Sequence, residues 1–132
     1  MMTTIPVETR QHAQLVDITH LVQKAVKESG IQTGVVTVFV PHTTAAVTIN
    51  ENADPDVVHD LLADLERIVP WDQKYYLHGE GNSAAHLKSS LIGSTQDVFV
   101  ENGRLVLGTW QGIYFCEFDG PRNRKVHVKM MG

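Results

Sequence analysis

The most informative stretch for the fold is Gly108-Thr109-Trp110-Gln111-Gly112-Ile113-Tyr114-Phe115-Cys116-Glu117-Phe118-Asp119. Its even-numbered positions, from Trp110 to Phe118, carry mainly aromatic or small side chains and predict a face that lies on a core. Its odd-numbered positions are apolar in the middle, at Ile113 and Phe115, and polar at both ends. Because a strand that is apolar on both faces is covered on both faces, we predict a long central strand. Its second cover would be a helix, another sheet or a partner subunit.

The segments around this strand alternate between strand-like and helical patterns. The strongest helical pattern begins at Asp54-Pro55-Asp56, where Asp54 suits the N-cap and Pro55 the first helical position, and it stops at Pro70. Strands, then helices, then strands again predict an α+β fold with a largely antiparallel sheet. The predicted strands cover 4–10 (an edge strand), 34–40, 45–50, 97–100, 104–107, 108–119 and 125–130, and the predicted helices cover 17–29, 55–69 and 83–91.

The composition is that of an ordinary globular protein. The chain has 132 residues, 42% of them hydrophobic and 20% charged, with a net charge of −4. This length predicts a single domain over residues 1–132. The acidic balance disfavours a nucleic-acid partner, because such domains usually carry a basic stripe, and no apolar stretch approaches the roughly 18 residues of a membrane span.

Cys116 is the only cysteine, so the chain cannot form an internal disulfide, which fits a reducing compartment. The N-terminal residues lack the basic and apolar regions of a signal peptide, so we predict a cytoplasmic protein. Cys116 lies in an apolar run, where a small buried residue is the more common role.

The segment His78-Gly79-Glu80-Gly81-Asn82-Ser83-Ala84-Ala85-His86 combines a flexible loop with the start of a helix. Asn82 is a good N-cap, and Asn82 and His86 share one face of the helix because they are four residues apart. The free N–H groups of a helix N-terminus favour an anion, and imidazoles bind metals or transfer protons. This segment is therefore a candidate binding site.

Two further segments carry groups capable of chemistry. His42-Thr43-Thr44 interrupts two predicted strands, where hydroxyl groups usually cap the backbone of a loop. Downstream, Asp54 and Asp56 are explained by helix capping, whereas Glu51 is not and would suit Mg²⁺. At the end of the long strand, Glu117 and Asp119 lie on one side, and a salt bridge to Arg122 is the simplest expectation.

The remaining histidines are expected to be exposed or structural. No pair of histidines has the spacing His-x-x-x-His, and the chain has no Cys-x-x-Cys motif, so spacing alone supports a metal site only weakly. We expect His12, His20 and His59 to be exposed and His127 to have a structural role.

Three motifs together resemble one family. They are Pro41-His42-Thr43-Thr44-Ala45-Ala46 with 50–56, His78 to Lys88, and Gly108-Thr109-Trp110-Gln111-Gly112-Ile113 with 117–122. In this order they resemble the YjbQ-like family, described as secondary thiamine-phosphate synthases, over nearly the whole chain.

This resemblance implies a compact α+β domain with a β-sandwich core and about three helices, assembled as a homotrimer. It implies a polar cleft that joins a hydroxymethylpyrimidine diphosphate to a thiazole phosphate with release of pyrophosphate, and a divalent metal, Mg²⁺ or Zn²⁺. The candidate residues fall into three groups. They are His78, His86, Glu117 and Asp119 for catalysis, His42, Thr43, Thr44, Asn50, Asn82, Gln111 and Arg122 for the substrate, and His42, Glu51, His78 and His86 for the metal.

Two other functions use the same residues. A trimeric protein that binds a metal or a phosphorylated metabolite would need the cluster without a general base. A metal-dependent hydrolase would need three nitrogen ligands and an open position on Zn²⁺. Ile113 and Phe115 supply a reason for a trimer, since a partner subunit would cover these apolar side chains on an otherwise polar face.

Overall fold

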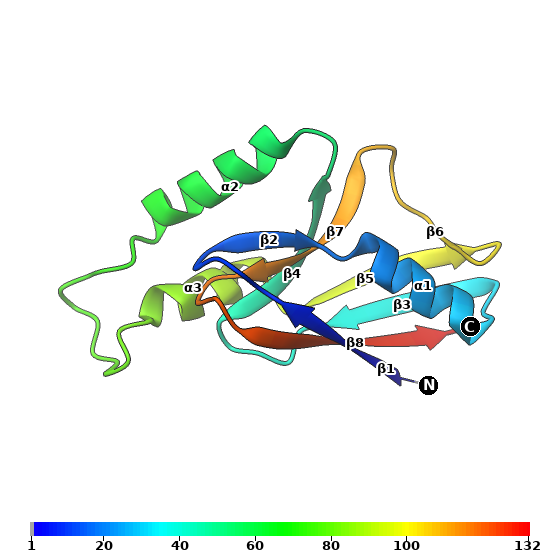
Figure 1. Cartoon of the computed structure of the whole chain (residues 1–132), viewed down its shortest axis with the longest axis horizontal. Coiled ribbons are helices and arrows are strands. Elements are labelled where there is room, and N and C mark those ends of the chain that lie inside the picture. The colour runs from blue at the N-terminus through cyan, green and yellow to red at the C-terminus, as the bar shows by residue number, and fades with distance from the viewer. Residues whose placement is uncertain (1) are drawn as a thin grey trace.

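The computed structural model describes residues 2–132 and contains eight strands and three helices (Figure 1). The strands are β1 (Met2–Glu8), β2 (Gln14–Asp17), β3 (Thr33–Phe39), β4 (Ala45–Glu51), β5 (Thr95–Glu101), β6 (Arg104–Leu105), β7 (Gln111–Glu117) and β8 (Asn123–Met131). The helices are α1 (Thr19–Ser29), α2 (Pro55–Ile68) and α3 (Ser83–Ile92).

Two antiparallel sheets form a sandwich, which confirms the predicted α+β class. One sheet has the strand order β1-β8-β3-β5-β6 and the other β2-β7-β4. β1 is an edge strand, as predicted, and tolerates Pro6 for that reason. Between the sheets lies a core rich in valine, to which α1 contributes Val22 and Val26.

Strand β7 is covered on both faces, as its sequence predicts, and both covers belong to its own chain. Ile113 and Phe115 are completely buried between the two sheets. On the opposite face, Cys116 and Phe118 are buried together with apolar side chains of α2 and α3. The expectation that a partner subunit covers Ile113 and Phe115 is therefore wrong. Trp110 is also not a core residue: it precedes β7 and is 63% exposed.

Helices α2 and α3 begin where the sequence predicts. The carboxylate of Asp54 accepts the N–H of Asp56 at 2.9 Å, so Asp54 is the N-cap of α2 and Pro55 its first residue. Lys88 of α3, although 4% exposed, donates to Glu66 of α2 at 2.8 Å. Burial acts to raise the pKa of Glu66, but the hydrogen bonds from Lys88 and the Trp71 N–H, together with the charge of Lys88, outweigh it and lower that pKa. This ion pair joins the two helices.

One local prediction is corrected, and one is made more specific. The helix predicted from Asp17 begins at Thr19, because the Asp17 side chain accepts the N–H and the hydroxyl of Thr19 and ends a short strand, β2, that the sequence pattern did not reveal. The break predicted at 41–44 is a connection between sheets, since β3 and β4 belong to different sheets. This segment therefore crosses between the sheets and carries His42 to the edge of the sandwich.

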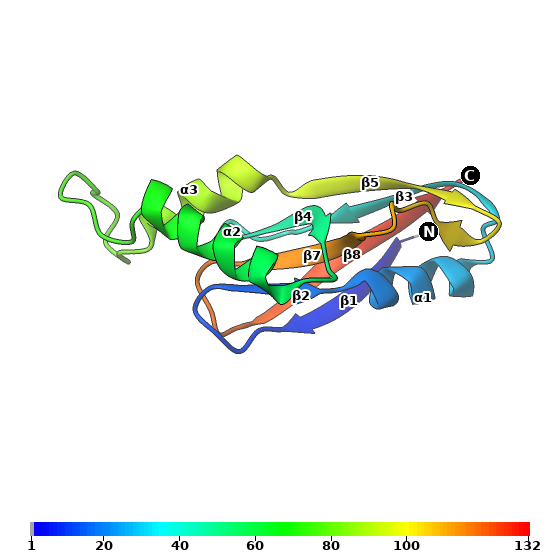
Figure 2. The same cartoon turned by 90° about the horizontal axis from the view of Figure 1, so that it is seen from above.

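Three strands begin or end close together at one end of the sandwich. β4 begins opposite the end of β7, with Ala45 paired to Glu117, and β8 begins nearby after a short turn. The termini lie at the other end, and the loop after α2 projects from the end that carries α3 (Figure 2). None of the helices within residues 2–132 is long and apolar enough to cross a membrane.

Candidate functional site

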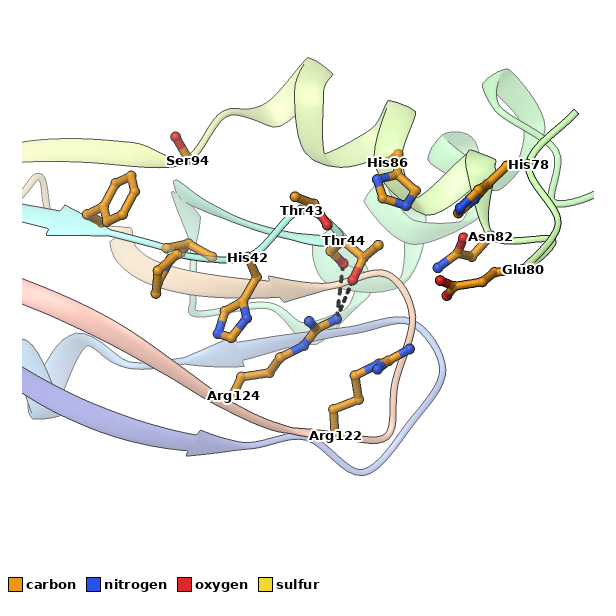
Figure 3. Close-up of a pocket in the computed structure, with 13 residues that line it drawn as sticks. His42, Thr43, Thr44, His78, Glu80, Asn82, His86, Ser94, Arg122 and Arg124 are labelled. Atoms are coloured by element: carbon orange, nitrogen blue, oxygen red, sulfur yellow. Dashed lines mark hydrogen bonds between the residues drawn. The ribbon is translucent and has the colours of Figure 1, made fainter. Parts of the chain in front are cut away.

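A pocket of about 620 Å³ opens at the end of the sandwich where His42, the segment from His78 to His86, and Arg122 come together (Figure 3). It lies between the connection that crosses the sheets, the start of α3 and the turn before β8. We call it the phosphate pocket. Its polar lining is formed by His42, Thr43, Thr44, His78, Glu80, Asn82, His86, Ser94, Arg122 and Arg124.

Arg124 is held in the pocket wall by the buried carboxylate of Glu117. Its Nε donates to Glu117 Oε1 at 2.8 Å, and one terminal nitrogen contacts Glu117 Oε2. The same terminal nitrogen donates to Thr44 Oγ1 at 2.8 Å. Arg124 is 8% exposed and Glu117 is fully buried. A buried guanidinium is thereby fixed in one orientation by a paired, bidentate contact.

Glu117 accepts two further hydrogen bonds. The Thr9 hydroxyl donates to Oε1 at 2.8 Å and the Asp119 N–H to Oε2 at 3.0 Å. Burial acts to raise the pKa of Glu117, but the hydrogen bonds from Arg124, the Asp119 N–H and Thr9 outweigh it and lower that pKa. Glu117 is thus a charged residue that positions Arg124, rather than a general base facing a substrate.

Asp119 connects the second arginine to α3. Its Oδ2 accepts a terminal N–H of Arg122 and the side-chain amide of Asn82, each at 2.9 Å. The Arg122 Nε also donates to the Asp119 carbonyl oxygen at 2.8 Å. Asn82 occupies the predicted N-cap position of α3, but its side chain turns to Asp119 instead of to the helix. The predicted salt bridge of Arg122 is confirmed for Asp119, whereas Glu117 pairs with Arg124.

His42 is bound to the backbone of β8. Its Nε2 lies 3.1 Å from the Lys125 N–H and 3.2 Å from the Lys125 carbonyl oxygen. Burial, and then the charge of Arg124, lower the pKa of His42 below its ordinary 6.5. The imidazole is therefore neutral near pH 7, and its Nε2 accepts the hydrogen bond from Lys125.

The motif at the start of α3 contributes two neighbouring imidazoles. The ring centroids of His78 and His86 are 5.3 Å apart, with the ring planes at 81°. Both rings line the pocket, across from Arg122 and Arg124 (Figure 3). Glu80 adds a carboxylate to the same loop.

Three predicted site residues lie elsewhere. Glu51 pairs with Gln111 at the opposite end of β4 and β7 from Ala45 and Glu117. Six residues of extended strand span about 20 Å, so Glu51, Asn50 and Gln111 do not share the phosphate pocket. Their side chains bind nearby backbone N–H groups instead, those of Asp54, Glu51 and Gly108 respectively.

The predicted metal ligands are correspondingly dispersed. His78 and His86 are neighbours, His42 is bound to the Lys125 backbone, and Glu51 lies at the far end of the sheet. Within residues 2–132, no three His, Cys, Asp or Glu side chains are grouped so that they could hold a metal ion. The donor set of this chain by itself does not fit a metal centre.

Arg124 is the functional residue that sequence reasoning missed, although the sequence carries its signal. In β8 the even positions Val126, Val128 and Met130 face the core, and Arg124 continues that alternation. A charged residue on the apolar side of a strand needs a buried partner. That partner is Glu117, at the polar end of β7 in the other sheet.

The other residues singled out in the sequence have structural or surface positions. Cys116 is 1% exposed and burial raises the pKa of its thiol to about 12, so it does not act as a nucleophile. His12, His20 and His59 are exposed, as expected. His127 contacts the Thr4 hydroxyl through Nδ1 at 2.9 Å, which fits its predicted structural role.

Comparison with known proteins now identifies the family. The family model described as "UPF0047 protein YjbQ-like" matches residues 3–132. The chain belongs to the YjbQ family. Among its relatives, the UPF0047 protein YugU of Bacillus subtilis is 53% identical over 100% of both chains, and UPF0047 protein MJ1081 of Methanocaldococcus jannaschii is 47% identical over 100% of this chain and 95% of the relative.

Solved structures of the YjbQ family share the whole fold. The structure of a YjbQ/UPF0047 protein from Clostridium acetobutylicum has a TM-score of 0.95 and 56% identity, covering 98% of this chain and 99% of that one. A structure from Sulfolobus solfataricus, described as a "YbjQ-like protein of unknown function", gives the same TM-score of 0.95 at 35% identity, covering 100% of this chain and 96% of that one. The α+β sandwich is therefore the fold of the family.

Proposed function

We propose that the phosphate pocket binds a small molecule through a phosphate or diphosphate group. The observation that supports this most is the pair of guanidinium groups, Arg122 and Arg124, each held by its own carboxylate at the pocket wall. Arginine forks match phosphate oxygens in geometry and charge. The hydroxyls of Thr43 and Thr44 and the start of α3 add neutral donors beside them.

We further propose the transferase reaction that the family resemblance implies, thiamine-phosphate synthesis. The ring nitrogen of a thiazole phosphate attacks the methylene carbon of the pyrimidine diphosphate with its lone pair. A C–N bond forms, the C–O bond to the diphosphate breaks, and the electron pair leaves with pyrophosphate. Charge therefore develops on the leaving oxygen, where Arg122 and Arg124 would stabilise it. An N–H of His78 or His86 would donate a hydrogen bond to the same group.

Binding is tested first with pyrophosphate, the predicted leaving group. Isothermal titration should show a single site in the wild-type chain, and Arg122→Ala should weaken it about tenfold to a hundredfold, the equivalent of one charge-assisted hydrogen bond. Arg67→Ala is the matched control, because Arg67 is an exposed arginine that pairs with Asp64 on α2. Equal affinity in all three proteins would contradict the assignment of the pocket.

Turnover is tested separately. The purified chain, given the pyrimidine diphosphate and the thiazole phosphate, should form thiamine phosphate, and His86→Ala should reduce the rate while circular dichroism stays unchanged. Binding of pyrophosphate without any product would instead favour the second candidate function, a phosphometabolite-binding protein. Glu117 is committed to Arg124, Thr9 and the Asp119 N–H, so in either function its role would be to position Arg124.

The homotrimer and the cytoplasmic location remain predictions from the resemblance and from the single cysteine. Light scattering should give three times the chain mass of 14.7 kDa. A peak at the mass of one chain would contradict the trimer.

A further inference from the structure

A second pocket lies at the opposite end of β3 and β5 from the phosphate pocket, between α1 and the hairpin of β5 and β6 (Figure 1). It has a volume of about 520 Å³, which is in the range of small-molecule sites. We call it the hairpin pocket. Its lining consists of Gln23 and Lys27 from α1, residues 31–32 before β3, and residues 102–104 of the hairpin.

The hairpin that forms one wall of this pocket is held in place by α1. The side-chain amide of Gln23 donates to the Gly103 carbonyl oxygen and accepts the Leu105 N–H, each at 3.0 Å. The turn residues Asn102 and Gly103 have positive φ angles of 53° and 72°, which an Asn-Gly pair adopts readily in a two-residue hairpin turn. The backbone of Arg104, directly after this turn, is therefore in position before a ligand binds, which lowers the cost of binding.

Lys27 and Arg104 bring two positive charges to the hairpin pocket. Within residues 2–132, its lining contains no carboxylate, and neither cation forms an ion pair. Glu28, next to Lys27 in the sequence, pairs with Lys24 at 3.7 Å. Glu101, opposite Arg104 in the hairpin, accepts a threonine hydroxyl of β3 at 3.4 Å. Two like charges that line one cavity repel each other, and an anion bound between them offsets this repulsion.

The position of the hairpin pocket favours carboxylates over phosphate. It lies at the last turn of α1, the end of a helix that carries partial negative charge, whereas phosphate commonly binds the N–H groups of a helix N-terminus. The helix end accounts for a cation at Lys27 but not for Arg104, which belongs to β6.

The rest of the lining suits a short carbon chain with polar ends. Ile31 adds an apolar side chain to the wall. The Nε2 of Gln32 lies 3.5 Å from the Gly30 carbonyl oxygen, and its second N–H is available to a ligand. A guanidinium and an ammonium on separate elements match two carboxylates joined by such a chain.

We infer that the hairpin pocket binds a small aliphatic dicarboxylate. The Arg104 fork binds one carboxylate, the Lys27 ammonium binds the other, and the carbon chain lies against Ile31. The inference goes beyond the proposed function and does not depend on it, because the hairpin pocket shares no lining residue with the phosphate pocket.

The test is a titration followed by NMR of the side-chain amides, which shows where a ligand binds. Succinate should shift the signals of Gln32 and Asn102, which line the hairpin pocket, while Asn82 reports the phosphate pocket separately. Butyrate has the same chain length with one carboxylate. It and inorganic phosphate should each bind at Gln32 and Asn102 at least about tenfold more weakly than succinate, the equivalent of one charge-assisted hydrogen bond. No shift with succinate, or equal affinity for phosphate at these two amides, would overturn the inference.

Two variants on separate elements remove one charge each. Lys27→Gln and Arg104→Gln should each weaken succinate binding at least about tenfold, and either one tests the pocket if the other does not fold. Lys129→Gln is the matched control, because Lys129 is an exposed lysine of β8 that does not line the pocket. It should bind succinate like the wild type. Unchanged affinity in Lys27→Gln and Arg104→Gln, or an equal loss in Lys129→Gln, would overturn the assignment.

Discussion

The two ends of the three-stranded sheet look alike in sequence and differ in structure. Each end carries a glutamate at a strand tip: Glu117 of β7 lies opposite Ala45 at one end, and Glu51 of β4 lies opposite Gln111 at the other. At the first end the carboxylate is fully buried and paired with a buried arginine. At the second end Glu51 accepts a backbone N–H in the turn before α2.

This difference shows that the burial of a carboxylate, and not the density of polar residues, distinguishes a candidate site from a helix cap. The acidic run 51–56 is denser in carboxylates than the end of β7, yet Asp54 and Glu51 are used to bind backbone N–H groups. Glu117 contacts three other side chains or backbone groups and holds an arginine at a pocket wall. Four experiments test this difference between the two ends of the sheet.

The largest effect is expected on stability. Glu117→Ala leaves the Arg124 guanidinium buried without a counter-charge and should lower the free energy of unfolding by about 3–5 kcal/mol. Glu51→Ala, the matched change at the opposite end, should stay within about 0.5 kcal/mol of the wild type. Urea unfolding measures both, with Glu117→Gln as a milder variant. Equal losses at the two ends would contradict the comparison.

A smaller loss is expected at the capped helix. Asp54→Ala removes the acceptor for the Asp56 N–H and should cost about 1 kcal/mol of unfolding free energy. Asp54→Ser keeps an acceptor at the N-cap and should recover most of this loss. Because Asp54 lies outside the phosphate pocket, pyrophosphate affinity should be the same in all three chains, and a weaker affinity in Asp54→Ala would show that the two ends are coupled.

The pH dependence of stability should show that the folded chain keeps His42 neutral. Its pKa is lowered in the folded chain, so below pH 6.5 the unfolded chain binds a proton that the folded chain does not. The unfolding free energy should therefore decrease as the pH falls from 6.5 towards the lower pKa of the folded state. Above pH 6.5, His42 should add no pH dependence to the unfolding free energy. Urea unfolding between pH 8 and 5 measures this. His42→Gln should give a flatter profile than the wild type, and parallel profiles would contradict the assignment.

The smallest effect is expected for the two amides that were predicted to bind substrate. Asn50→Ala and Gln111→Ala should leave the affinity for pyrophosphate within about twofold of the wild type, because their side chains accept N–H bonds at the far end of the sheet. Isothermal titration measures these affinities, and the loss in Arg122→Ala shows how large the effect of a pocket residue is. A loss as large as that of Arg122→Ala would restore these residues to the site.

Most of the fold could be predicted from the sequence because its signals are local. The stripe from Val57 to Val69, the cap at Asp54 and the two apolar faces of 108–119 each depend on neighbours within a few residues. β2 was missed because it has four residues, ends at an Asp17 that binds Thr19, and gains its stability by pairing with β7. Such pairing is invisible in a short sequence window.

The candidate site was predicted only in part, since its contacts join distant segments. The motifs at His42, His78–His86 and Arg122 meet in the phosphate pocket, as expected. The pairing of Glu117 with Arg124 was not predicted, because the sequence pattern drew attention to Arg122. Arg122 lies in the turn before β8 and is half-exposed, whereas Arg124 lies within β8 and is buried. The alternation of β8, read from Val126, Val128 and Met130, would have predicted that Arg124 faces the core and needs a buried partner.

The network around Glu117 has a consequence for the order in which the chain acquires function. It joins Thr9 from the beginning of the chain, Thr44 from the middle and Arg124 from the last strand. Contacts of such long sequence separation form late and slowly in folding. Under the proposed function, a growing chain would therefore carry every motif of the family before the anion site is assembled, which happens only when β8 pairs. Pyrophosphate binding would then be a direct assay of chain completion, which no shorter fragment passes.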